Sequence, residues 1–371
     1  MANEFHTKQL RGGYTTGACA AAGAKAAIML MKGHKVEHLQ IEALDGTMLD
    51  IPVKDVSLTA KGAVAEIVKH SGDDPDITDG VSVFTSVEQI EDGAGIHFFA
   101  GEGIGTVTKK GLSVPPGEPS INPGPRRLII ETIQKIAGAD AAFNVIISIP
   151  GGRELAKKTL NPVLGIEGGL SIIGTTGVLR PMSEEGFKNS LVPQIDVALE
   201  AGYKTQVFVP GKIGQDAAAS HGIPEGAVVQ TSNFIGFMLE SAADRGLDRV
   251  MLFGHIGKLA KVAAGTFYTH NRQGDGRMEA IAAYAAADGL PSEYVRKILT
   301  STTTEAALPI IDDHGLQRVY DELAARASER AERYVFGQLK VGTVMVTLQG
   351  RVLGMDMNAK KMGEAFMWDI T

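Results

Sequence analysis

Residues 249–258 read RVMLFGHIGK, a dense apolar run that ends in a glycine loop. An apolar run of this kind is typical of a strand that is buried on both faces of a parallel sheet. Three earlier runs have the same form and also end in glycine loops: NVIISIP (144–150), LSIIG (170–174) and TQVFVP (205–210). Helical patterns over residues 184–201 and 234–245 separate the later runs. Strands that alternate with helices predict one parallel sheet with right-handed crossovers.

The end of the chain extends this pattern. Residues 276–332 read as helical, with Pro291 at the start of one helix. A last apolar run over residues 343–348 predicts a strand at one edge of the sheet. The sequence therefore predicts a Rossmann-like, mostly parallel sheet domain over residues 141–371.

The first part of the chain has shorter and more varied elements. An alanine-rich helix is expected over residues 15–31, with Thr15 or Thr16 near its N-cap and Gly33 just past its end. Short β-like runs follow, separated by glycine, aspartate and proline clusters, at 39–43, 49–53, 63–69, 81–87 and 96–100. A second helix is expected over residues 126–137. We therefore expect an α+β domain over residues 1–140, and a two-domain α/β protein as a whole.

Composition bounds the function. With 371 residues the chain exceeds the roughly 250–300 residues at which a single hydrophobic core stops growing, so its length predicts two domains. A net charge of -7 with no evident basic face argues against a general nucleic-acid-binding protein. The lone Cys19 excludes an intrachain disulfide and a multi-cysteine metal site, and the nine histidines show no paired metal spacing, so we expect no metal ion held by the protein.

The chain shows no signal for a membrane. No apolar run approaches the roughly 20 residues that span a bilayer. Residues 1–11 lack the apolar core of a signal peptide. We expect a cytoplasmic protein with no membrane partner; a homo-oligomer is one alternative that the sequence leaves open.

The glycine loops predict a ligand site. In an open parallel sheet such loops line up along the carboxyl edge, where ligands bind. Glycine lets a ligand approach the backbone, and a helix start offers free N–H groups. The glycines of any one loop could simply close a tight turn, but four loops in succession favour a nucleotide-like site. Its candidate residues are Gly151, Gly152, Gly174, Thr175, Thr176, Gly211, Gly254 and Lys258.

The segment TFYTHNRQGDGR (266–277) is the most polar stretch near these loops. A loop so rich in hydrogen-bonding side chains is typical of a substrate-facing loop, although a solvated connection fits equally well. His255 and His270 are the candidate catalytic residues, because a histidine can accept or return a proton near neutral pH. The alternative is that His255 only caps its loop and that His270 is a surface residue.

Two further segments carry candidate residues for an anionic substrate. TKKGLSVPPGEPSINPGPRR (108–127) is a long irregular loop with basic flanks, and RGGYTTGACA (11–20) places glycines and hydroxyls before a helix start. A solvated connection and a simple capped start remain the alternatives. Cys19 has no identifiable partner histidine and is expected to pack as a small buried residue. The candidate substrate-binding residues are Arg11, Thr15, Thr16, Lys109, Lys110, Arg126, Arg127 and Arg272.

Together these segments resemble the cobalt-precorrin-5B C1-methyltransferases. The matching stretches run in order over nearly the whole chain: GYTTGACAAAGAKAA from Gly13, GEPSINPGPRR from Gly117, NPVLGIEGGLSIIGTTGVLRPMSEE from Asn161, GHIGKLAKVAAGTFYTHN from Gly254 and STTTEAA from Ser301. Ala18 departs from the threonine expected in this family.

The resemblance implies transfer of a methyl group from S-adenosylmethionine to C1 of a cobalt-corrinoid in anaerobic cobalamin biosynthesis. It identifies no catalytic residue, so the site residues rest on the patterns described above. Two rival functions remain: a nucleotide-dependent phosphotransferase that uses the same glycine loops, and a non-catalytic tetrapyrrole-binding protein. The first would need acidic magnesium ligands, which the sequence does not place.

Overall fold

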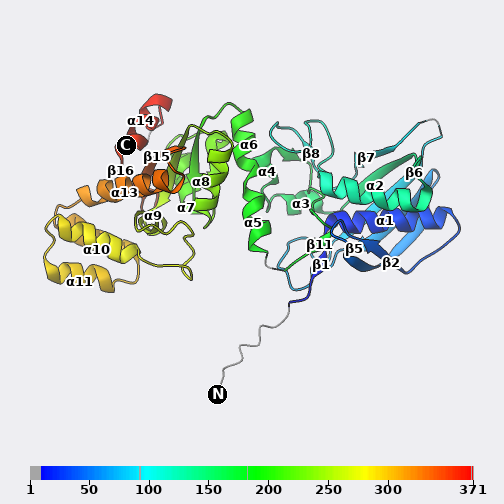
Figure 1. Ribbon diagram of the computed structural model, residues 1–371, viewed down its shortest axis with the longest axis horizontal. Coiled ribbons are helices and arrows are strands. Elements are labelled where there is room, and N and C mark those ends of the chain that lie inside the picture. The colour runs from blue at the N-terminus through cyan, green and yellow to red at the C-terminus, as the bar shows by residue number, and fades with distance from the viewer. Residues whose placement is uncertain (1–9, 92, 182, 369, 371) are drawn as a thin grey trace, which may run out of the picture. The chain divides into compact units, whose positions relative to one another are not determined.

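The computed structural model describes residues 10–91, 93–181, 183–368 and 370, so the expectation for residues 1–11 falls mostly outside the described residues. The chain forms two compact units that divide between Glu184 and Glu185 (Figure 1). The expected boundary near residue 140 falls inside unit 1, because the chain beyond that point returns to the sheet of unit 1. The expected mixed α/β architecture is confirmed, with five sheets among the described residues, some of them with parallel strands.

Unit 1 is built on a five-stranded sheet of order β4-β5-β6-β9-β7, in which only the β7–β9 pair is parallel. The strands of unit 1, including those of three two-stranded sheets, are β1 (Gly13–Tyr14), β2 (His38–Glu42), β3 (Met48–Pro52), β4 (Asp55–Leu58), β5 (Gly62–Val68), β6 (Ser82–Gln89), β7 (Ile96–Ala100), β8 (Thr106–Val107), β9 (Phe143–Ser148), β10 (Ile166–Glu167) and β11 (Val178–Leu179). Its helices are α1 (Thr16–Met31), α2 (Pro123–Ala137), α3 (Gly152–Ala156) and α4 (Asn161–Leu164). The expected early strands and both helices are confirmed.

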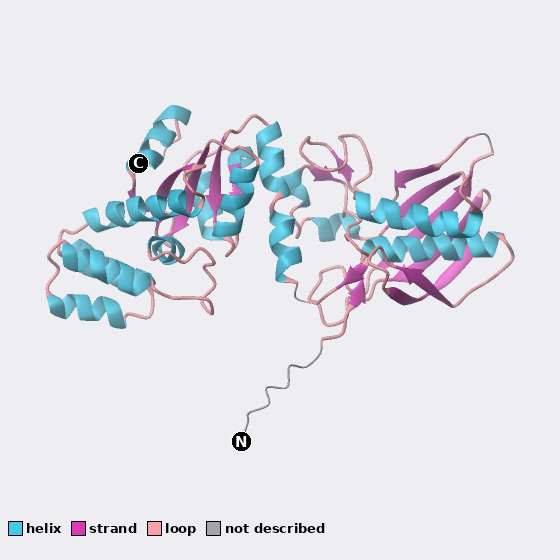
Figure 2. Cartoon of the chain, viewed as in Figure 1, coloured by secondary structure: helices cyan, strands magenta, loops and turns pink. Residues whose placement is uncertain are grey.

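The alanines and glycines of α1 let this helix lie close to the sheet. α1 packs on β5 and β6, and α2 runs beside it (Figure 2). A Cβ atom at Gly23 would lie 2.8 Å from the Thr85 Cβ, so a larger side chain would push the helix away. Cys19, on the same helix, is fully buried, and burial raises the pKa of its thiol to about 12. The expectation that Cys19 packs as a buried residue is confirmed.

Two of the four apolar runs do not belong to the parallel sheet of the second unit. NVIISIP forms β9, which pairs antiparallel with β6 and parallel with β7 inside unit 1. LSIIG forms no strand of its own; Leu170 makes an isolated bridge to Ile104, and Ile172 makes one to Ile121. The prediction that both runs join the other two is wrong, because a buried apolar run records burial and not the identity of its neighbours.

Unit 2 contains a five-stranded sheet of order β13-β12-β14-β15-β16, parallel except for β16. Its strands are β12 (Thr205–Val209), β13 (Val228–Gln230), β14 (Arg249–His255), β15 (Lys340–Val346) and β16 (Val352–Met355). The remaining two apolar runs form β12 and β14, as expected. The run over residues 343–348 contributes to β15, but β15 is an inner strand because β16 covers it. The short edge strands β13 and β16 were not expected.

The helices of unit 2 precede β12, connect the strands of the sheet or follow β16. They are α5 (Glu184–Leu191), α6 (Pro193–Glu200), α7 (Lys212–Ser220), α8 (Ile235–Asp244), α9 (Ile256–Ala263), α10 (Arg277–Ala287), α11 (Ser292–Thr300), α12 (Thr304–Asp313), α13 (Arg318–Tyr334) and α14 (Met357–Phe366), with a short 3-10 helix at Glu225–Ala227. Within the described ranges, none of the helices combines the length and apolar character that a bilayer crossing requires.

Candidate functional site

A basic pocket lies at the carboxyl edge of the parallel sheet in unit 2. Strand order reverses between β12 and β14, and a crevice forms at such a point because the two connections leave in opposite directions. The pocket has a volume of about 460 Å³. The residues that line it, which we call the basic pocket, are Asn233, His255, Gly257, Lys258, Lys261, Thr269, His270, Asn271, Arg272 and Arg277.

His255 ends β14 and caps the helix α9 that follows. Its Nδ1 accepts a hydrogen bond of 3.1 Å from the Gly257 backbone N–H, which assigns the proton of a neutral ring to Nε2. Nε2 lies 3.0 Å from a carboxylate oxygen of Glu305, in the first turn of α12. The same oxygen accepts a hydrogen bond of 2.8 Å from the Leu348 backbone N–H. Both ring nitrogens of His255 are therefore engaged by the protein itself.

Lys261 is a buried lysine that holds the polar loop in place. Its side chain is 1% exposed, and its Nζ donates to the Thr269 carbonyl at 3.2 Å and to the Asn271 Oδ1 at 2.7 Å. The Asp275 carboxylate lies 3.7 Å from the same Nζ. Burial lowers the pKa of Lys261, and Arg277 lowers it further, while Asp275 opposes the shift. The ammonium group thus fixes residues 269–271 at the rim of the pocket.

Lys258 joins the first turn of α9 to the end of β12. Its Nζ donates a hydrogen bond to the Pro210 carbonyl. Burial lowers the pKa of Lys258, and the charge of Lys261 lowers it further. A Cβ atom at Gly211 would lie 3.6 Å from the same Nζ, so the glycine loop after β12 approaches the lysine closely.

The polar loop expected from the sequence brings further side chains to this pocket. His270 and Arg272 are exposed, and the His270 Nδ1 accepts a hydrogen bond of 3.2 Å from the Arg272 backbone N–H. Among the residues that the structure describes, no carboxylate forms an ion pair with the Arg272 guanidinium. The structure therefore gathers four of the expected residues in one pocket, although they were assigned to different ligands: His255, Lys258, His270 and Arg272.

Sequence reasoning missed several residues of this site, namely Lys261, Arg277, Asn233 and Glu305. The spacing of Lys258 and Lys261, three residues apart in a helix, could have indicated a shared face for both lysines. Glu305 offered no such signal, because it reaches His255 from 50 residues further along the chain.

The other two glycine loops lie in unit 1, so the prediction that all four line one sheet edge is wrong. Gly174 adopts a φ of +133°, and a Cβ atom there would lie 2.5 Å from the Thr15 Oγ1. A Cβ atom at Gly152 would lie 2.3 Å from the Gly103 carbonyl oxygen. Thr175 and Thr176 follow Gly174, and the Thr176 Oγ1 accepts a hydrogen bond from the Val178 backbone N–H. These contacts give the loops a role in the packing of unit 1.

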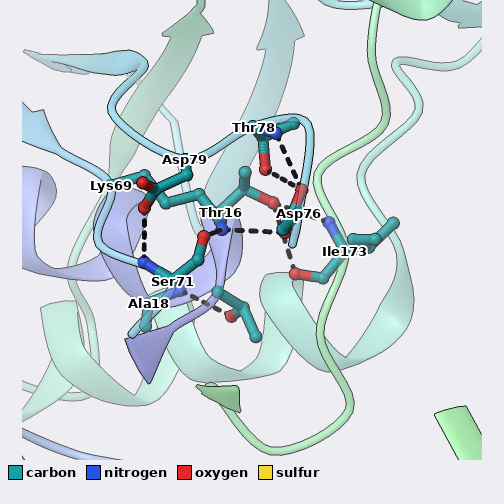
Figure 3. A network of polar contacts seen from close by, with 9 residues as sticks. Thr16, Ala18, Lys69, Ser71, Asp76, Thr78, Asp79 and Ile173 are labelled. Carbon is teal, nitrogen blue, oxygen red and sulfur yellow. Dashed lines mark hydrogen bonds and ion pairs between the residues drawn. The ribbon is translucent and has the colours of Figure 1, made fainter. Parts of the chain in front are cut away.

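The two threonines at the start of α1 make contacts within the fold of unit 1. The Thr15 side chain caps α1 by accepting a hydrogen bond of 3.2 Å from the Ala18 backbone N–H. The Thr16 Oγ1 accepts a hydrogen bond of 3.1 Å from the Ile173 backbone N–H (Figure 3). Both threonines are buried.

Figure 3 also shows Lys69, a buried lysine that no sequence pattern indicated. The Lys69 Nζ donates to the Ser71 Oγ at 2.6 Å and to the Asp76 carboxylate at 2.8 Å. Burial alone would raise the pKa of Asp76, but hydrogen bonds from Lys69 and Thr78 outweigh it and lower the pKa. The Lys69 side chain is buried and paired with Asp76, so its charge is balanced inside unit 1.

A second pocket, of about 530 Å³, lies in unit 1 between the irregular loop and α2. The residues that line it, which we call the Arg126 groove, are Ser113, Val114, Pro115, Pro123, Arg126, Arg127, Ile130, Glu131 and Gln134. Arg126 donates to the Glu118 carboxylate at 2.8 Å and to the carbonyls of Pro119 and Ile121 at 3.2 and 2.8 Å. Its guanidinium also lies over the Phe98 ring, 5.4 Å from the centroid.

The other basic candidates of unit 1 have partners of their own or lie on the surface. Arg127 pairs with Glu131 at 2.7 Å, and Arg11 pairs with Asp73 at 2.9 Å. The Lys109 Nζ donates to the Val163 carbonyl at 3.1 Å. Lys110 is exposed. These four residues belong to unit 1, whereas Arg272 belongs to unit 2.

Comparison with known proteins matches both units. The family model described as CbiD matches residues 3–181, and the model described as CbiD, C-terminal domain matches residues 268–357. A "Cobalt-precorrin-5B C(1)-methyltransferase" of Moorella thermoacetica is 49% identical over 95% of this chain and 97% of its own length. A protein of the same name from Methanocaldococcus jannaschii is 44% identical over 94% of this chain and 96% of its own length.

A solved structure is also similar in sequence. The crystal structure titled cobalamin biosynthesis protein (cbiD), from Archaeoglobus fulgidus, is 27% identical and aligns with a TM-score of 0.39 over 72% of this chain and 84% of that chain.

Proposed function

The chain belongs to the CbiD family, and from that membership we propose that it transfers a methyl group to C1 of cobalt-precorrin-5B in cobalamin biosynthesis. The family match along nearly the whole chain carries this proposal, because relatives of this chain that are named for the reaction match both of its units. The basic pocket supports it with a cationic site that is suited to an anionic group of a ligand.

We propose S-adenosylmethionine as the methyl donor. Its sulfonium activates the methyl group, so an electron-rich ring carbon can form the new C–C bond while the C–S bond breaks and S-adenosylhomocysteine leaves. The positive charge passes to the macrocycle and is discharged when a proton is lost to a base. The protein therefore has to align donor and acceptor and exclude water, and it needs no nucleophile of its own.

We place the donor along the carboxyl edge of the sheet in unit 2, at Gly211, which follows β12, and at Gly254, near the end of β14. These glycines lie at the carboxyl ends of the two strands between which strand order reverses, which is where ligands bind in open α/β sheets. Gly152 and Gly174 pack against other groups of unit 1, and Gly151, Thr175 and Thr176 belong to the same two loops of that unit. The support for a donor site therefore rests on Gly211 and Gly254.

Of the two candidate catalytic histidines, His270 is the better placed to handle the proton. His255 already uses both ring nitrogens, on Gly257 and Glu305. His270 is exposed at the basic pocket and engages only its Nδ1 in a hydrogen bond within the described part of the chain. If His270 handles the proton, His270→Ala should slow single-turnover methyl transfer by about 10²–10⁴-fold with both ligands saturating. An unchanged rate would remove this role from His270.

The reaction itself is tested with the purified full chain, cobalt-precorrin-5B and a donor labelled in its methyl group. We expect one labelled methyl group per macrocycle, at C1. A protein that binds the macrocycle but shows no affinity for S-adenosylhomocysteine would be a tetrapyrrole carrier. A melting temperature raised by ATP and not by S-adenosylmethionine would instead favour the phosphotransferase.

A further inference from the structure

We infer that the basic pocket binds carboxylate groups of the macrocyclic substrate, and that the sulfonium of the methyl donor lies outside it. This inference rests on the proposed function and refines it, because it moves Lys258 from the donor to the acceptor. It also adds Lys261 and Arg277 to the residues that serve the acceptor.

The first support is the charge of the pocket lining. Four side chains of the lining are cationic, Lys258, Lys261, Arg272 and Arg277, and no aspartate or glutamate is among the lining residues. The chain as a whole has a net charge of -7, so the positive charge of this pocket is opposite in sign to that of the whole chain. A cleft lined by one sign of charge attracts ligands of the opposite sign.

The second support is that the nearby carboxylates leave part of this charge unbalanced. Asp275 lies between two of the cations, 3.7 Å from the Lys261 Nζ and 3.1 Å from the Arg277 Nε. Glu305 is occupied by His255 and by the Leu348 backbone N–H. Lys258 contacts only a neutral carbonyl, and Arg272 forms no ion pair with any described residue. Two cations therefore remain for a ligand.

The third support is the chemistry of the two substrates. A sulfonium is a cation, and placing it among four cations would cost electrostatic free energy. The corrinoid substrate carries several carboxylates, which an arginine binds through two parallel hydrogen bonds and a lysine binds as a point charge. A pocket of about 460 Å³ suits the carboxylate-bearing edge of the macrocycle.

Lys261 acts in this site as a positioning residue. Its ammonium group is buried and bonded to the Thr269 carbonyl and the Asn271 Oδ1, so it holds the backbone on both sides of His270. The loop that carries Arg272 is therefore anchored from inside the pocket.

Charge reversal at Arg272 tests the inference. Arg272 is exposed on a loop, so Arg272→Glu removes the ligand contact without disturbing the core. Arg296→Glu is the matched control, because Arg296 is an exposed arginine of the same unit that lies outside the pocket. Lys258→Met provides a second variant that removes a charge while it retains an unbranched side chain. The measurements are the KM for cobalt-precorrin-5B and the Kd for S-adenosylhomocysteine by calorimetry.

We expect Arg272→Glu to raise the KM for the corrinoid at least about tenfold, Lys258→Met to raise it severalfold, and Arg296→Glu to leave it unchanged. The Kd for S-adenosylhomocysteine should stay within about twofold in all three variants. A loss of donor-analogue affinity with an unchanged corrinoid KM would overturn the inference, as would unchanged values for both ligands. If the parent protein transfers no methyl group, the proposed function fails instead, and corrinoid binding by calorimetry still tests the pocket.

Discussion

The Arg126 groove of unit 1 and the basic pocket of unit 2 both contain arginines that the sequence offers to an anionic ligand. In the groove, the guanidinium of Arg126 is engaged within the protein, because it donates hydrogen bonds to the Glu118 carboxylate and to two carbonyls of its own loop. In the basic pocket, Arg272 forms no ion pair within the described residues, and Lys258 bonds only to a neutral carbonyl. The difference teaches that the number of basic residues in a segment does not identify a ligand site. A ligand site is identified by the charge that remains once the protein's own hydrogen bonds and ion pairs have formed.

The same contrast holds for the glycine loops. Gly174 in unit 1 is needed because Thr15 fills the space where a side chain would stand. Gly211 in unit 2 faces the end of Lys258 at the pocket.

The lone cysteine and the lone tryptophan report on the two units separately, because Cys19 is buried in unit 1 and Trp368 is buried in unit 2.

The largest effect is expected for Gly174→Val. The substitution strains a backbone at a φ of +133° and places a side chain against Thr15, so unit 1 should lose about 2–6 kcal/mol of stability. The rate of thiol labelling at Cys19 measures this loss, and Trp368 fluorescence should show unit 2 still folded. Gly151→Val is the control, because Gly151 has a φ of +77° with no atom within 4 Å of the new Cβ. A stably folded Gly174→Val variant that fails to bind S-adenosylhomocysteine would return this loop to the donor site.

Arg126→Leu comes next, with an expected loss of about 2 kcal/mol from the stability of unit 1. Its hydrogen bonds join a charged group to the irregular loop, and bonds to charged groups contribute about 1.5–3 kcal/mol each in favourable cases. Cys19 labelling again gives the measurement.

Arg127→Leu is the control, since an exposed pair four residues apart in a helix contributes about 0.3–0.5 kcal/mol. If Arg127→Leu weakens corrinoid binding as strongly as Arg272→Glu, the groove is also a ligand site and the contrast between the pockets is lost.

His255→Ala should cost unit 2 about 1 kcal/mol. The variant removes the N-cap of α9 and leaves Glu305 without its histidine partner, and the loss of a cap costs about 0.5–2 kcal/mol. Denaturant unfolding followed by Trp368 fluorescence measures the change. His270→Ala, in an exposed loop, should leave this transition unmoved. Equal stability of both variants would show that His255 is not acting as a cap.

The smallest effect is expected from pH. Burial lowers the pKa values of Lys258 and Lys261. The charge of Lys261 lowers the pKa of Lys258 further, whereas Lys261 itself faces Asp275, which raises its pKa, and Arg277, which lowers it. Lys258 attracts a carboxylate only while it is protonated, and Lys261 holds the loop that carries Arg272 only while it is protonated. Affinity for the corrinoid is therefore complete below these pKa values and is lost as pH rises through them. Between about pH 8 and about pH 10, below the ordinary lysine pKa of about 10.4, we expect a loss of severalfold. Calorimetry at constant ionic strength measures it, and a flat profile would remove both lysines from the binding site.

The sequence predicted the elements of this protein better than their partners. Capping by Thr15, the alanine-rich α1 and the early strands depend on residues close together in the chain, and local patterns record them. β12 and β14 were found because a continuous apolar run reports burial. NVIISIP has the same appearance, yet β9 pairs with β6 and β7 of unit 1, because the choice of neighbours depends on strands that lie far away in sequence.

The site divides in the same way. By itself, the sequence determined the family to which the chain belongs and the polar segment that carries His270 and Arg272, because both are written in contiguous residues. Only the tertiary structure decided which charges remain for a ligand. Glu305 reaches His255 across 50 residues, and Lys261 is buried under a loop whose path no local pattern fixes. Electrostatic interactions depend on distance in space, and the fold alone sets those distances.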